Sequence, residues 1–222
     1  MPFPGEVLLR QIDERIEKRH LLKHPFYQDW QAGKLTRGAL QLYAAQYYRH
    51  VKAFPVYLRM LAARADGALR GVILQNLAEE ENPRAPHPKL WGDFATAVGV
   101  SEETLDSCPA LPGTQALVET YRRICGGRPV AEAVAALYAY EAQVPEIATQ
   151  KLDGLRRFYG VTEPRGLAYF AVHEEADQAH RAAWSNWLSA EYTGETEDVL
   201  GTTDEALGVL WGALDAVHRP VA

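Results

Sequence analysis

The chain has 222 residues, of which 47% are hydrophobic and 23% charged, and this composition is typical of a globular protein rather than a disordered or fibrous one. Its 23 basic and 29 acidic residues give a formal charge of −6, which argues against nucleic acid as a partner because phosphate binding requires a basic surface. Two cysteines exclude a disulfide scaffold and favour a reducing, cytoplasmic location. The N-terminal residues lack the pattern of a signal peptide, and no stretch has the roughly 20 apolar residues of a membrane span.

Apolar residues recur with the 3.6-residue period of α-helices along nearly the whole chain, and the alternation typical of strands is almost absent. In chain order, the pattern predicts helices over about 6–22, 36–55, 67–82, 87–98, 114–125, 129–159, 163–190 and 203–218, with a short segment near 25–33. Pro55 is expected at the end of the second helix and Pro145 at a kink in the sixth, since proline interrupts the helical hydrogen-bond ladder. With no internal repeat or linker, residues 1–222 are predicted to form one all-α domain of seven or eight main helices.

Ionisable residues stand on the apolar faces of three of these helices. Helix positions i, i+4 and i+7 share a face, so Glu80 and Glu141 each continue an apolar stripe, and His173, Asp177 and His180 continue a third. Burying an isolated carboxylate costs several kcal/mol unless something compensates it. Arg and Lys are not interleaved on these faces, which makes metal ions the natural counter-charge.

His87 lies seven residues after Glu80, beyond a break made by two prolines, so the chain can turn back and offer both side chains to one point. The predicted ligand set is therefore Glu80, His87, Glu141, His173, Asp177 and His180. Three carboxylates and a bridging hydroxide balance two divalent ions, and helix bundles hold di-iron and di-manganese centres in this way. Nitrogen and oxygen ligands favour iron or manganese, with zinc also possible. A mononuclear site and a polar core without metal remain alternatives.

Five segments resemble a known family: HPFY (24–27), YYRHVKAFP (47–55), EEN (80–82) followed by His87, AALYAYEAQVP (135–145) and HEEADQAH (173–180). They are similar to the chlamydial death-domain-associating protein (CADD) group of heme-oxygenase-like dimetal oxidases, which are relatives of PqqC and TenA. The resemblance covers about residues 6–190, and residues 191–222 match nothing reliable.

The resemblance implies a heme-oxygenase-like helical bundle that holds two divalent metal ions, iron or manganese, in place of heme. The ligand positions of the family fall on the six residues named above. Members of the group are linked to para-aminobenzoate synthesis for folate, with dioxygen as co-substrate. The resemblance implies that Tyr27 supplies the ring and Lys151 the nitrogen, with Tyr43 as a neighbouring tyrosine of the site. It also implies a homodimer, with the substrate or product in the helical core.

Other interpretations remain open at this point. Tyr27 could simply pack beside Phe26, and Lys151 could be a solvated residue near a helix end. The same metals could oxidise an external substrate such as a free amino acid or fatty acid, or zinc could support hydrolysis. A PqqC-like ring oxidase would need no metal, and a TenA-like thiaminase would need a cysteine in the helix that here reads 134–141, where none is present. A non-enzymatic interaction protein is the alternative of a different class.

Overall fold

The computed structural model describes residues 3–218, without the side chains of residues 175–178. The described residues form helices and no strands, which confirms the predicted all-α class. The elements are α1 (Pro4–Lys18), η1 (Leu21–Lys23), α2 (Pro25–Gln31), α3 (Arg37–Ala62), α4 (Gly67–Glu80), α5 (His87–Ala97), α6 (Glu102–Ser107), α7 (Pro112–Gly127), α8 (Val130–Glu141), α9 (Val144–Arg157), α10 (Pro164–Glu191) and α11 (Glu197–Val217).

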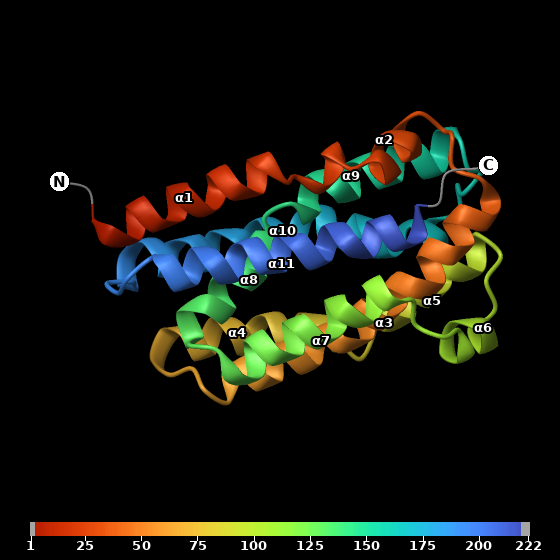
Figure 1. Cartoon of the computed structure of the whole chain (residues 1–222). Helices are drawn as coiled ribbons and strands as arrows, with labels where there is room; N and C mark the ends of the chain where they lie inside the picture. Colours follow the sequence, from red (N-terminus) through yellow and green to blue (C-terminus); the bar gives the residue numbers. More distant parts are fainter. Residues whose placement is uncertain (1–2, 219–222) are drawn as a thin grey trace.

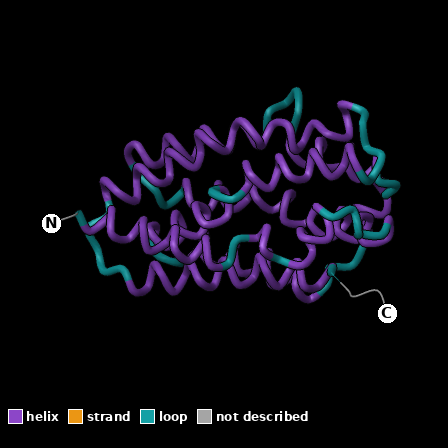
Figure 2. The backbone as a smooth tube through the Cα atoms, turned by 90° about the horizontal axis from the view of Figure 1, so that it is seen from above, coloured by secondary structure: helices purple, strands orange, loops and turns teal. Residues whose placement is uncertain are grey.

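The long helices lie side by side as an elongated bundle. In Figure 1, α10 and α11 run through the middle of the molecule, with α1 on one side and α3, α4 and α7 on the other. Seen from above (Figure 2), the helices follow the length of the molecule and several connections lie at its two ends. Helix α11 packs against α7 and α8, and α10 packs against α1, α5, α8 and α9. This arrangement surrounds a continuous apolar core. None of the helices in the described part of the chain has the length and apolar character needed to cross a membrane.

Helix α3 continues for seven residues beyond Pro55, so the prediction of a helix end there is wrong. Thr36 caps the start of the helix, because its side chain accepts a hydrogen bond from the Ala39 amide at 3.1 Å. An internal proline costs a helix about 3 kcal/mol. The next turns bury Leu58 and Leu61 completely, and each buried leucine stabilises the fold by about 1.5–3 kcal/mol. Apolar burial on both sides of Pro55 therefore outweighs the missing hydrogen bond.

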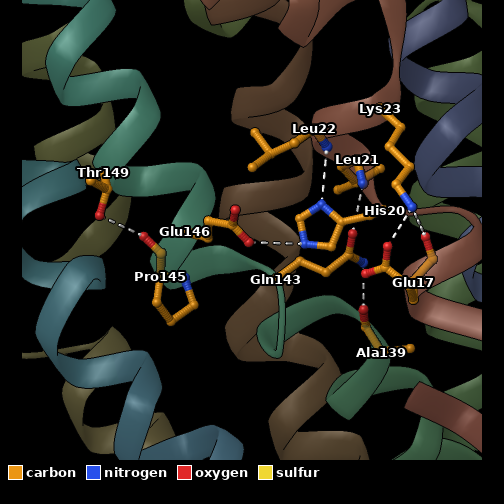
Figure 3. Close-up of polar contacts among 10 residues, drawn as sticks. All are labelled: Glu17, His20, Leu21, Leu22, Lys23, Ala139, Gln143, Pro145, Glu146 and Thr149. Atoms are coloured by element: carbon orange, nitrogen blue, oxygen red, sulfur yellow. Dashed lines mark hydrogen bonds and ion pairs between the residues drawn. The ribbon is translucent and has the colours of Figure 1, made fainter. Parts of the chain in front are cut away.

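The expected helix over 129–159 is divided into α8 and α9, which meet at residues 142–143. The side chain of Gln143, fully buried, occupies this junction. Its Nε2 donates to the Ala139 carbonyl at 2.7 Å, and its Oε1 accepts from the Leu21 amide at 2.8 Å (Figure 3). One amide thus pairs a carbonyl at the end of α8 with an amide at the start of η1. Pro145 falls in the first turn of α9, where its missing N–H has no helical partner to lose.

The described residues form more helices than the seven or eight expected, and some helix ends differ from the prediction. Residues 102–107 form the short helix α6, which begins at Ser101 with its hydroxyl accepting from the Thr104 amide at 3.1 Å. The segment near 25–33 contains a true helix, α2, and the first helix ends at Lys18 before η1. Helix α11 begins at Glu197, six residues earlier than expected.

Candidate metal centre

Glu80 and His87 come together across the turn between α4 and α5. Glu80 is the last residue of α4 and His87 the first of α5. The turn between them is closed by Asn82, whose Oδ1 accepts from the Arg84 amide at 3.0 Å. Both side chains are buried, and His87 Nδ1 lies 2.8 Å from Glu80 Oε1. The proline-containing break therefore returns the chain to the end of α4, as its spacing predicts.

His173 of α10 completes a compact group of donor atoms with this pair. One ligand atom from each of Glu80, His87 and His173 lies within 4.8 Å of the other two. The His87 and His173 rings are 4.5 Å apart between centroids. His173 Nδ1 is 2.6 Å from the carbonyl oxygen of Tyr169, and because a carbonyl can only accept, Nδ1 carries the hydrogen. This leaves the Nε2 lone pair of His173 as its ligand atom.

Glu141, the last residue of α8, lies beside this group and is held by two donors. Asn76 Nδ2 donates to Glu141 Oε1 at 2.9 Å, and Trp184 Nε1 donates to Oε2. His180 Nδ1 lies 3.5 Å from Glu141 Oε1, and both side chains are buried. Glu80, Glu141 and His173 line one small cavity with room for about one water molecule. Four helix segments, the ends of α4 and α8, the start of α5 and the middle of α10, thus contribute to one place.

Asp177, the sixth predicted ligand, lies on α10 between His173 and His180, and its side chain is outside the described residues. Of the other five, the structure brings Glu80, His87 and His173 together most closely and places the Glu141–His180 pair beside them. Glu79, which is not among the predicted site residues, also reaches this group. Its Oε2 lies 2.9 Å from His180 Nε2.

The electrostatics of the group suit a divalent cation. Burial raises the pKa of Glu80, and the neighbouring His87 opposes that rise. Burial lowers the pKa of His173 to about 3, so its imidazole is neutral and can act as a ligand. Within the described residues, no Arg or Lys pairs with Glu80 or Glu141. Buried carboxylate and imidazole groups without thiolate are a donor set that fits iron or manganese.

A second small cavity adjoins the first and contains Lys151. Its lining shares Tyr140, Tyr169 and His173 with the cavity at Glu80, and it also includes Tyr27. It admits only about one or two water molecules. Tyr27 also borders a third cavity, which lies under the last turns of α11. Tyr27 therefore borders both internal spaces, as Leu21 and Tyr47 also do.

Lys151, Tyr43 and Tyr27 form a buried polar chain beside this second cavity. Lys151 Nζ donates to the Tyr43 hydroxyl at 2.6 Å, and the Tyr27 hydroxyl is 3.4 Å from that of Tyr43. Lys151 is only 5% exposed, which rules out the solvated alternative. Its Nζ lies 5.0–5.8 Å from the centroids of five aromatic rings, those of Tyr27, Tyr43, Tyr47, Trp91 and Phe170. This burial lowers the pKa of Lys151 to about 7, and burial raises the pKa values of Tyr27 and Tyr43.

Residues 41–210 match the model of a family described as iron-containing redox enzymes. The 4-aminobenzoate synthase of Nitrosomonas europaea is 41% identical over 224 residues, covering 95% of this chain and 90% of the relative. That of Chlamydia pneumoniae is 43% identical over 207 residues, covering 92% of each chain. The pyrroloquinoline-quinone synthase of Xanthomonas campestris pv. campestris is 27% identical over 228 residues, covering 98% of this chain and 88% of the relative.

Solved structures share the fold at low sequence identity. A TenA homologue from Pseudomonas syringae pv. tomato has a TM-score of 0.82 at 17% identity, with 96% of this chain and 91% of the other covered. Heme oxygenase-1 from the cyanobacterium Synechocystis has a TM-score of 0.65 at 12% identity, with 95% of this chain and 90% of the other covered. The heme-oxygenase-like bundle expected from the sequence is therefore confirmed.

Proposed function

This chain belongs to the family of iron-containing redox enzymes and is an oxidoreductase, and from this premise we propose that it forms 4-aminobenzoate for folate synthesis. In this proposal the ring comes from its own Tyr27 and the nitrogen from Lys151, with dioxygen as the oxidant. The names of the relatives support the product, and the buried chain of hydroxyl and amine groups beside the candidate metal centre supports the two residues.

The observation that carries the proposal is the contact between Lys151 and Tyr43 beside Tyr27. A solvent-exposed lysine with a pKa near 10.4 is almost fully protonated at pH 7, with roughly one molecule in 10³ neutral. A pKa of about 7 leaves a substantial neutral fraction, and only the neutral amine has the lone pair of a nucleophile. The Tyr43 hydroxyl accepts from Lys151 and lies beside the Tyr27 hydroxyl, so it orients both groups.

The size of the cavity favours an internal over an external substrate. Beside Lys151 there is space for about one or two water molecules, which is far less than a free aromatic amino acid requires. Tyr27 is among the aromatic rings that already line this space, and its hydroxyl adjoins the Lys151–Tyr43 pair. An external substrate would have to displace packed side chains, at a cost that a resident ring avoids.

We propose that Glu80, His87, Glu141, His173, Asp177 and His180 hold two iron or manganese ions in the active state. When bound, such ions supply the redox equivalents and Lewis acidity needed to use dioxygen. The chain contributes the neutral imidazole of His173, oriented by the Tyr169 carbonyl, and the Glu141 carboxylate, oriented by Asn76 and Trp184. It also excludes bulk water, since these side chains are buried.

The proposal is tested by intact mass before and after reaction of the metal-loaded protein with reductant and dioxygen. We expect a mass loss that maps to Tyr27, and at most one equivalent of 4-aminobenzoate per chain. More than one equivalent per chain, with residue 27 unchanged, would instead establish an external substrate.

Tyr27→Phe should abolish product while metal content stays that of the wild type, because the phenol oxygen matters to oxidation and little to packing. Tyr57→Phe is the matched control, since Tyr57 is also fully buried and its hydroxyl bonds only weakly to the Val118 carbonyl at 3.5 Å. Lys151→Arg should also stop product, because a guanidinium stays protonated. Product from Tyr27→Phe at the level of Tyr57→Phe would exclude Tyr27 as the source of the ring.

A further inference from the structure

Glu79 lies next to the predicted ligand Glu80 on α4 but has a different partner. Its side chain is 40% exposed and reaches the buried ring of His180 on α10, with Oε2 at 2.9 Å from Nε2. One turn earlier, Gln75 Nε2 donates to the other carboxylate oxygen, Oε1, at 3.2 Å. Glu79 therefore links the solvent-facing side of α4 to a residue of the candidate metal centre.

This contact decides which nitrogen of His180 carries a hydrogen. A carboxylate accepts hydrogen bonds, so the imidazole must present an N–H at Nε2. In the neutral ring the lone pair then belongs to Nδ1. Nδ1 is the nitrogen on the inner side, 3.5 Å from Glu141 Oε1. Two acceptor atoms facing one another at that distance are an arrangement that a shared cation stabilises.

We propose that Glu79 is a positioning residue of the metal centre, which holds His180 so that Nδ1 faces the metal while Nε2–H binds the carboxylate. The proposal rests on the metal-dependent function above. His173 has the opposite arrangement, with Nδ1 tied to the Tyr169 carbonyl and Nε2 left as the ligand atom. Carboxylates that accept from a metal-bound histidine orient the ring and raise its basicity, and their loss typically lowers metal affinity 10–100-fold.

Glu81 provides a natural control on the other side of Glu80. Its side chain is 41% exposed, almost the same as that of Glu79, and it pairs with Arg59 of α3 instead of a histidine. The two residues therefore match in charge, exposure and distance along the chain from Glu80. They differ in their partners among the described side chains, which are His180 for Glu79 and Arg59 for Glu81.

The first test measures Mn²⁺ affinity of the full chain by competition with a chelator, for wild type, Glu79→Ala, Glu79→Gln and Glu81→Ala. We expect Glu79→Ala to weaken binding about 10–100-fold and Glu81→Ala to leave it unchanged. Glu79→Gln keeps an oxygen acceptor for Nε2–H and should fall between them. Equal affinities for Glu79→Ala and Glu81→Ala would overturn the proposal.

The second test needs no metal. Nitrogen-15 NMR of the metal-free protein, with the His180 signals assigned from a His180→Asn variant, reports which ring nitrogen is protonated. We expect protonation at Nε2 in the wild type and a mixture of both neutral forms in Glu79→Ala. An Nδ1-protonated ring in the wild type, or an identical spectrum in Glu79→Ala, would refute the assignment. If the wild type binds no Mn²⁺, the proposed function fails, and the NMR result still decides the role of Glu79.

Discussion

Replacing Lys151 by methionine should stabilise the metal-free protein at acidic pH. Burial lowers the pKa of Lys151 from 10.5 to about 7, a change equivalent to about 5 kcal/mol at 1.36 kcal/mol per pKa unit. Below pH 7 the amine is charged in both states, so the folded protein bears this full cost. Methionine has a similar unbranched shape and no charge to desolvate. The lost hydrogen bond to Tyr43 removes about 1 kcal/mol, which leaves a net gain of about 4 kcal/mol.

The gain should shrink as the pH rises. Between pH 7 and 10.5 the unfolded chain keeps the lysine proton while the folded chain has released it, so the unfolding free energy of the wild type increases with pH. The slope reaches about 1.4 kcal/mol per pH unit, and Lys151→Met lacks this contribution. Two pH units above the folded pKa, the advantage of the variant should have fallen by about 3 kcal/mol.

Urea unfolding with chelator, at a pH near 6 and another near 9, measures both values. Lys52→Met is a suitable control because Lys52 is about half exposed, and its substitution should change stability little at either pH. A Lys151→Met advantage that is the same at both pH values would refute the reasoning, because it would mean that Lys151 does not titrate near pH 7 in the folded protein.

Three further outcomes are expected. Chelating the metal should lower the melting temperature. The free energy of unfolding gained from bound Mn²⁺ grows with the free Mn²⁺ concentration and reaches about 2.7 kcal/mol at 100 times the dissociation constant. Identical melting curves with and without chelator would argue against a specific site. Gln143→Leu leaves two buried backbone groups unpaired and should destabilise the fold by about 2–6 kcal/mol in urea titrations. Gln46→Leu removes bonds to the Pro109 carbonyl and the Leu111 amide and should destabilise the fold by a similar amount, and an unchanged free energy of unfolding in either variant would contradict this reasoning. Trp184→Phe removes a donor to Glu141 and should weaken Mn²⁺ binding about 10-fold, as read by chelator competition.

Much of the fold follows from local patterns that the sequence carries. Apolar residues at helical spacing set the class, and Thr36 at the start of α3 is of a residue type that typically caps helices. The position of Pro55 was misread because an isolated proline is a local signal, whereas the burial of Leu58 and Leu61 is decided by helices packed from elsewhere in the chain. The break before α9 likewise depends on a partner, Leu21, more than a hundred residues away from Gln143.

In the candidate site, too, some residues can be predicted from local sequence patterns and others depend on how the helices pack. Glu80, Glu141 and His173 are visible in the sequence because a charge on an apolar stripe requires an explanation. Glu79 escapes that argument, since its exposure makes it resemble any solvated glutamate, and only the approach of α10 gives it a partner. The low pKa of Lys151, on α9, also depends on rings from four other helices, α2, α3, α5 and α10, which the fold brings around it.

The position of Tyr27 beside two cavities affects the stability of the chain after that residue has reacted. If its ring is consumed, one of the three side chains that line both the space beside Lys151 and the space under α11 is lost, and a larger void remains in the core. Removing a buried aromatic side chain typically costs about 3–5 kcal/mol, and the whole stability of a domain is about 5–15 kcal/mol. A used copy would thus unfold far more often than a fresh one, and cellular proteases act on the unfolded population. A chain that has reacted would therefore be degraded faster than one that has not, because its core is less stable.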